Sequence, residues 1–151
     1  MTRLLGIDLG QRRIGLAVGD TETGVARGLA TIARGDTERD AATLARLVRE
    51  QRVDEFVLGL PRNADGSEGP QALGTRAWAA DVLAGLRLPV AFRDEYLTSV
   101  AAEGNLGRMP RGRAGGPPSR AALERRRGAV DREAARLILQ AELDVRRGVR
   151  S

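Results

Sequence analysis

The sequence predicts an α/β protein: a mixed β-sheet with an antiparallel meander of three strands, then parallel strands, flanked by α-helices. Two observations predict this class. Three short apolar stretches joined by polar turns open the chain, and strand-like and helix-like stretches then alternate. Strand–helix–strand units place their strands parallel, and sites gather at the carboxyl ends of such strands. A chain of 151 residues is large enough for one domain, 1–151, with a real core.

The meander is expected over residues 4–9, 13–20 and 25–32, with a turn at Gly10-Gln11-Arg12. Asp8 ends the first apolar run, where a sheet core would favour another leucine. A carboxylate in such a place is costly unless a cation or hydrogen-bond donors compensate it. Asp8 is therefore a candidate functional residue. The alternative is that it caps the amides of the following turn.

The remaining elements follow in order. A helix opens at residues 36–40, and a strand covers 53–59. A polar loop, 62–69, leads to a second helix that starts at Pro70, with an apolar side expected at Leu73, Ala77, Ala80 and Ala84. A strand over 89–93, a short helix over 98–103 and a last helix from about Ala129 complete the chain.

Residues 104–127 interrupt this pattern with several glycines and prolines. They hold seven arginines and one glutamate, whereas the whole chain has a net charge of +5, so the rest is close to neutral. We expect a flexible basic loop that contacts the phosphates of nucleic acid. The alternative is a solvated insertion without a partner.

The composition excludes several kinds of chemistry. The chain has no cysteine, histidine or lysine, which removes thiolate and imidazole metal sites, a histidine base and Walker-type phosphate binding. Carboxylates remain, and they favour hard cations such as Mg²⁺ or Mn²⁺. Scarce aromatic residues argue against a platform for stacked bases. No apolar run is long enough to span a membrane and no signal peptide is visible, so we expect a cytoplasmic protein.

Acidic residues begin or end three separate elements: Asp8, the pair Asp94-Glu95, and Asp131 at the start of the last helix. Carboxylates that meet on one side of a sheet repel one another unless cations bridge them. Bridged by two divalent ions, they would suit hydrolysis of a phosphodiester bond. Spacing does not choose between Asp94 and Glu95, because adjacent residues of a strand point to opposite faces. Asp131 is open to a second interpretation, as a cap of its helix.

The motif Gly6-Ile7-Asp8-Leu9-Gly10, with Arg13-Ile14-Gly15-Leu16-Ala17 after it, resembles the opening of the YqgF family. These bacterial proteins are described as Holliday-junction-resolvase-like or as pre-16S rRNA nucleases and have a ribonuclease-H-like fold. Three further blocks match in family order: Gly59-Leu60-Pro61 with the loop after it, Asp94-Glu95 with Leu97-Thr98, and Asp131 with Ala134-Ala135 and Ile138-Leu139-Gln140.

The resemblance implies that Asp8, Glu95 and Asp131 are catalytic and bind Mg²⁺ or Mn²⁺ as two ions, and it selects Glu95 over Asp94. The family has an arginine after the acidic pair where this chain has Tyr96, so Arg93 or a loop arginine is expected to replace it. We expect the substrate-binding residues to be Arg13, Arg62, Asn63, Arg93, Thr98, Arg108, Arg111 and Arg113.

Three functions remain open. The first is a metal-dependent nuclease that matures the 5′ end of pre-16S rRNA. The second is a resolvase of branched DNA, which would work as a homodimer with one site per strand. The third is an RNA-binding ribosome-assembly factor without catalysis. An actin-like ATPase is disfavoured, because that fold needs two lobes and the chain has no internal repeat.

Overall fold

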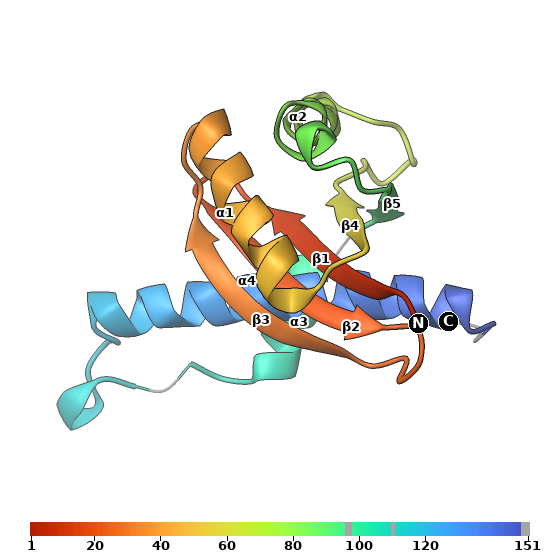
Figure 1. Cartoon of the computed structure of the whole chain (residues 1–151). Helices are drawn as coiled ribbons and strands as arrows, with labels where there is room; N and C mark the ends of the chain where they lie inside the picture. Colours follow the sequence, from red (N-terminus) through yellow and green to blue (C-terminus); the bar gives the residue numbers. More distant parts are fainter. Residues whose placement is uncertain (96–97, 110, 149–151) are drawn as a thin grey trace.

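Five strands form one mixed sheet in the computed structural model, which describes residues 1–95, 98–109 and 111–148, apart from the side chains of 98–100 and 113. The strands lie in the order β3-β2-β1-β4-β5. β1, β2 and β3 form the antiparallel meander, whereas β1, β4 and β5 run parallel (Figure 1), which confirms the predicted class. Their bounds are β1 Arg3–Leu9, β2 Arg13–Asp20, β3 Ala26–Ala33, β4 Glu55–Leu60 and β5 Val90–Asp94.

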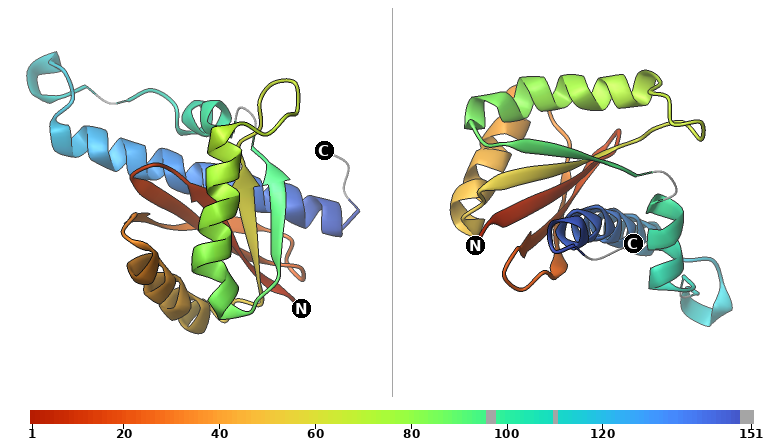
Figure 2. Two further views of the ribbon diagram at one scale, coloured as in Figure 1. Left: turned by 90° about the horizontal axis from the view of Figure 1, so that it is seen from above. Right: turned by 90° about the vertical axis from the view of Figure 1, so that its right-hand side faces the viewer.

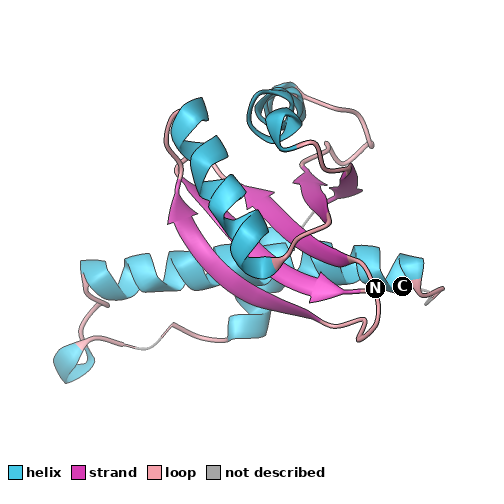
Figure 3. Cartoon of the chain, in the orientation of Figure 1, coloured by secondary structure: helices cyan, strands magenta, loops and turns pink. Residues whose placement is uncertain are grey.

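Helices cover both faces of this sheet, as Figures 2 and 3 show. α1 and α2 lie on one face, α4 crosses the other, and α3 packs mainly against α4. The bounds are α1 Thr37–Gln51, α2 Pro70–Trp78, η1 Ala79–Leu83, η2 Ala84–Leu86, α3 Thr98–Leu106, η3 Arg113–Gly115 and α4 Arg120–Arg146. Within the described ranges, no helix is both long and apolar enough to cross a membrane.

Side chains of the central strands alternate between two hydrophobic cores, because successive residues of a strand point to opposite faces. On β1, Leu5 and Ile7 belong to the core beneath α1 and η1, whereas Leu4 packs with Ile138 and Leu139 of α4. Asp8 has the same parity as Leu4. The alternation that builds the two cores therefore turns the Asp8 side chain toward α4.

The last helix begins at Arg120, not near Ala129, so the prediction of a loop up to residue 127 is wrong. Ser119 caps it by accepting a hydrogen bond from the backbone N–H of Ala122 at 3.1 Å. The glycines and prolines that predicted a loop all lie within 107–118, whereas 120–127 consists of good helix formers. Asp131 consequently lies in the body of α4 and not in its first turn.

The buried side of α2 also differs from the predicted one. Leu73 is 59% exposed, whereas Ala72, Thr75 and Trp78 are buried. Trp78 donates from Nε1 to the buried carboxylate of Asp40 at 3.1 Å and so ties α2 to α1. The predicted stripe consisted mostly of alanines, whose burial contributes little, so the much larger tryptophan sets the packing face.

Candidate active site

Asp8 stands near the carboxyl end of β1, on the side of the sheet that α4 covers. Its cross-strand partner on β2 is Gly15. On the other edge of β1, Ile7 pairs with Leu58 of β4, so Gly59, the next residue of β4, lies beside Asp8. Asp8 is thus flanked on both sides by residues that have no side chain. The space above these two glycines is open to groups from other elements.

α4 brings Asp131 over Gly15. A β-carbon at Gly15 would collide with the main-chain carbonyl group of Asp131, so the close approach of helix and strand requires glycine. Because Gly15 pairs with Asp8, this contact places Asp131 next to Asp8. The position in the body of the helix removes the alternative that Asp131 caps α4 or interacts with its N-terminal dipole.

Glu95 approaches Asp8 from the opposite side. It follows β5 directly, and its backbone N–H donates to the carbonyl of Leu60 at 3.2 Å. A β-carbon at Gly59 would lie 2.6 Å from Oε2 of Glu95, so the carboxyl group lies over that glycine. Its side chain is hydrogen-bonded to Asp8. The structure thus brings Glu95 to Asp8, whereas Asp94 is exposed to solvent.

Asp8 and Glu95 perturb each other's pKa strongly. Burial raises the pKa of Glu95 to about 9, helped by the charge of Asp8, the hydrogen bond with Asp8 and the charge of Asp94. Burial also raises the pKa of Asp8; the hydrogen bond from Glu95 opposes this rise and the charge of Asp131 adds to it. Glu95 is therefore protonated at neutral pH and donates to Asp8. Clusters of titratable groups with shifted pKa values are typical of catalytic sites.

Arg13 neutralises the third acid. Its Nε lies 2.6 Å from Oδ2 of Asp131, and both side chains are partly exposed. As the side chains stand, no three carboxylates within the described ranges are arranged to hold one metal ion. A proton on Glu95 and the guanidinium of Arg13 supply the compensation instead. Three clustered carboxylates with no nitrogen or sulfur ligand nearby fit the hard cations Mg²⁺ and Mn²⁺ by their donor chemistry.

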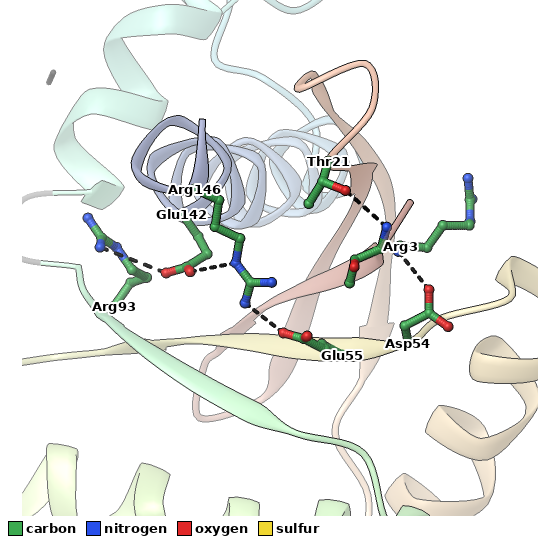
Figure 4. Close-up of polar contacts among 8 residues, drawn as sticks. Arg3, Thr21, Asp54, Glu55, Arg93, Glu142 and Arg146 are labelled. Atoms are coloured by element: carbon green, nitrogen blue, oxygen red, sulfur yellow. Dashed lines mark hydrogen bonds and ion pairs between the residues drawn. The ribbon is translucent and has the colours of Figure 1, made fainter. Parts of the chain in front are cut away.

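Two of the arginines expected to bind substrate are engaged in ion pairs. Arg13 is held by Asp131. Arg93 points along the α4 side of β5, where its guanidinium lies 3.8 Å from Glu142, which also binds Arg146 (Figure 4). Nε of Arg93 is buried without a hydrogen-bond partner in the described part of the chain. Arg93 thus faces the C-terminal half of α4 at Glu142, which lies about three helical turns beyond Asp131.

The other expected contacts lie in loops. Arg62 and Asn63 follow the carboxyl end of β4, at the same edge of the sheet as Asp8. Asn63 closes this loop internally by donating to Oγ of Ser67 at 3.0 Å, whereas Arg62 is exposed. Arg108 and Arg111 are exposed between α3 and α4. The side chains of Thr98 and Arg113 lie outside the described part of the structure.

Gly15 and Gly59 are the site residues that the sequence reasoning did not single out. Each glycine stands between two large apolar residues of its strand. A glycine inside such a strand indicates that another group approaches the backbone closely. That signal was available in the sequence. The partner on α4 or beyond β5, however, could not be read from the strands alone.

Comparison with solved structures defines the class of fold. The chain superposes on Thermus thermophilus RuvC in complex with a Holliday junction substrate with a TM-score of 0.54, 18% identity and 98% and 97% of the two chains covered. The fowlpox virus Holliday junction resolvase gives a TM-score of 0.54 at 13% identity, with 95% and 99% covered. These likenesses establish a RuvC-type, ribonuclease-H-like fold.

The chain belongs to the family described as "RuvX: Holliday junction resolvase", whose sequence profile matches residues 2–145. This membership confirms the resemblance inferred from the sequence motifs. A relative from Roseobacter denitrificans is 43% identical over 100% of this chain and 88% of its own length. One from Moorella thermoacetica is 44% identical over 94% of each chain. Both carry the name "Putative pre-16S rRNA nuclease".

Proposed function

We propose that this protein is a divalent-metal-dependent nuclease that hydrolyses phosphodiester bonds and matures the 5′ end of pre-16S rRNA. The observation that supports the chemistry most directly is the meeting of Asp8, Glu95 and Asp131 above Gly15 and Gly59 on the α4 side of the sheet. The family supports a nucleic-acid substrate, and the names of the relatives support precursor rRNA. Maturation of rRNA would place the protein in the cytoplasm.

The roles of the three acids follow from their positions. Two divalent ions held by these carboxylates would lower the pKa of the attacking water and stabilise the departing oxygen. Asp8, between the other two, is the residue expected to serve both ion positions. Glu95 and Asp131 complete the site from opposite sides. Glu95 must give up its proton to become a ligand, and Asp131 must leave Arg13, which frees that guanidinium for a substrate phosphate.

Resolution of Holliday junctions is the second candidate, because the family is described by that activity. A resolvase cuts two strands at symmetric positions, so this function requires a homodimer with one active site in each protomer. Processing of a single RNA end carries no such requirement. Solution mass and substrate choice together distinguish the two functions.

The test is a cleavage panel with purified protein in Mg²⁺ and in Mn²⁺. The substrates are an RNA with the 5′ leader of precursor 16S rRNA, a four-way DNA junction and a linear DNA duplex. We expect the wild type to cut the precursor RNA, and Asp8→Asn to lower its rate by about a hundredfold or more, as when one transition-state-stabilising group is lost. Asp81→Asn removes an exposed carboxylate on the opposite side of the sheet and is expected to cut as the wild type does.

Three results would count against this proposal. Cleavage by Asp8→Asn at the wild-type rate would remove the carboxylate site from the mechanism. RNA binding without cleavage in either metal would favour the third function, an assembly factor without catalysis. Cleavage of the four-way junction in preference to the RNA, by a dimer, would support the resolvase.

A further inference from the structure

A basic groove opens beside the candidate active site. Its volume is about 730 Å³, and it lies between the β1–β2 turn, β3 and the N-terminal half of α4. It is lined by five arginines and one glutamate, with a threonine and a glycine: Arg12, Arg13, Arg125, Arg127, Arg132, Glu124, Thr31 and Gly128. Arg13 lines the groove and also forms the ion pair with Asp131, so the groove borders the residue that connects it to the candidate active site.

Six of the seven arginines of α4 fall into two sets. Arg126, Arg136 and Arg146 each form an ion pair with a carboxylate. Arg125, Arg127 and Arg132 form no ion pair or side-chain hydrogen bond with any described residue, nor does Arg12 across the groove. Five arginines and the single carboxylate of Glu124 leave the groove with a net positive charge, and like charges gathered in this way destabilise a protein. Such an arrangement is expected where a polyanion supplies the missing charge.

The groove continues past α4. Arg125 and Arg132 also line a second hollow of about 910 Å³, between α4 and the segment that joins α3 to it. That segment extends beyond the sheet in Figure 1. It contributes Arg111 and the backbone of Gly112 and Gly116 to the hollow. The two hollows share Arg125 and Arg132, and together they form a path along the N-terminal half of α4 that begins beside Arg13.

The lining residues also indicate how a polyanion would be recognised. Among the described residues, no aromatic ring lines either hollow, so the ring platform on which single-stranded bases stack is missing from them. Guanidinium groups bind phosphate oxygens in a bidentate manner irrespective of the base attached. The path therefore has the chemistry to bind a sugar–phosphate backbone through its guanidinium groups.

We propose that Arg12, Arg125, Arg127 and Arg132 bind the sugar–phosphate backbone of the substrate strand next to the bond that is cut, independently of base sequence. This inference rests on the proposed nuclease function. Two of these residues, Arg125 and Arg127, belong to the basic stretch 104–127 that the sequence predicts to contact phosphates, and the structure places them on α4 and not in a loop. Precision of cutting then depends on the shape of the nucleic acid, because the groove supplies affinity without sequence preference.

The test measures binding and not cleavage, so that it remains valid if the protein proves inactive. The probes are a fluorescent RNA hairpin and a fluorescent four-way DNA junction, titrated in EDTA at several salt concentrations. The test variant combines Arg125→Gln, Arg127→Gln and Arg132→Gln. The control combines Arg46→Gln, Arg49→Gln and Arg52→Gln on and just after α1, on the opposite face of the sheet, with the same change of net charge.

We expect the α4 variant to lose about tenfold in affinity for each arginine removed. The slope of log affinity against log salt should fall by about 0.7 to 0.9 for each lost phosphate contact. The α1 control should bind nearly as the wild type does. Equal losses in the two variants, or no loss in the α4 variant, would overturn the inference. A loss with only one probe would support it and identify that nucleic acid as the ligand. Circular dichroism and the three single variants verify that α4 remains folded.

Discussion

Glu95 holds its proton at neutral pH because it is buried against a second carboxylate. Its pKa rises from the ordinary value of 4.5 to about 9. Between these two pH values the folded chain binds a proton that the unfolded chain does not. Stability conferred by this group is therefore fully present below about pH 4.5 and is lost as pH rises through the folded pKa of about 9. The raised pKa of Asp8 acts in the same direction.

The first prediction concerns this proton. In protein kept free of metal by a chelator, the free energy of unfolding by urea should fall between about pH 6 and about pH 9. Glu95→Gln should remove most of that fall, because glutamine has no proton to lose and its amide can still donate to Asp8. Equilibrium urea denaturation at each pH measures the difference.

Glu38→Gln is the matched control, because Glu38 is an exposed carboxylate in the first turn of α1. It should keep the pH dependence of the wild type. A Glu95→Gln protein whose stability declines with pH as steeply as that of the wild type would show that Glu95 is not the protonated partner of Asp8.

At the scale of elements, the packing of α4 on the sheet sets the site. Gly6 and Gly15 are both in contact with α4: a β-carbon at Gly6 would lie 2.8 Å from Cβ of Leu139, and one at Gly15 would collide with the Asp131 carbonyl. Small residues on β1 and β2 thus let the helix backbone come close enough to place Asp131 beside Asp8. The same closeness makes the helix sensitive to any added volume there.

The second prediction tests that closeness. Gly15→Ala should lower the free energy of unfolding by about 3 kcal/mol, at the upper end of the usual cost of overpacking, because backbone must move to admit the methyl group. Gly74→Ala makes the same substitution in α2, where a β-carbon meets nothing within 4 Å. It should stabilise the protein by about 0.5 to 1 kcal/mol, as alanine does within a helix. Urea denaturation of both variants measures these two changes in the free energy of unfolding, which should have opposite signs. A Gly15→Ala protein as stable as the wild type would contradict the close packing.

Elements could be predicted from the sequence where one local signal dominates. The three-strand meander and the helix that begins at Pro70 were predicted within a few residues. The predicted start of α4 was too late in the sequence. The glycines and prolines before Ser119 and the helix formers after it were treated as one loop, although the helix begins directly after Ser119. The buried side of α2 was mistaken, because Trp78 outweighs a stripe of alanines. Both errors arise where packing or capping overrides a local average.

At the scale of the whole molecule, the sequence predicted the mixed sheet and its flanking helices, since hydrophobic periodicity determines which stretches become strands and helices. Of the candidate site, the sequence predicted the three positions, and the family resemblance selected Glu95. Their juxtaposition depends on the register of β1 with β2 and β4 and on the path of α4 across them. The path of α4 also decides which arginines form ion pairs and which remain unpaired in the groove. The sequence alone does not reveal this.

The central claim is that Asp8, Glu95 and Asp131 together bind divalent cations. Anomalous scattering from a crystal of the wild-type protein grown with Mn²⁺ tests it most directly. We predict manganese peaks within ligand distance of all three carboxylates, about 2.0 to 2.6 Å for hard cations with oxygen ligands, with the guanidinium of Arg13 displaced from Asp131. Manganese bound elsewhere, with Asp131 still paired to Arg13 and Glu95 still bonded to Asp8, would contradict the account.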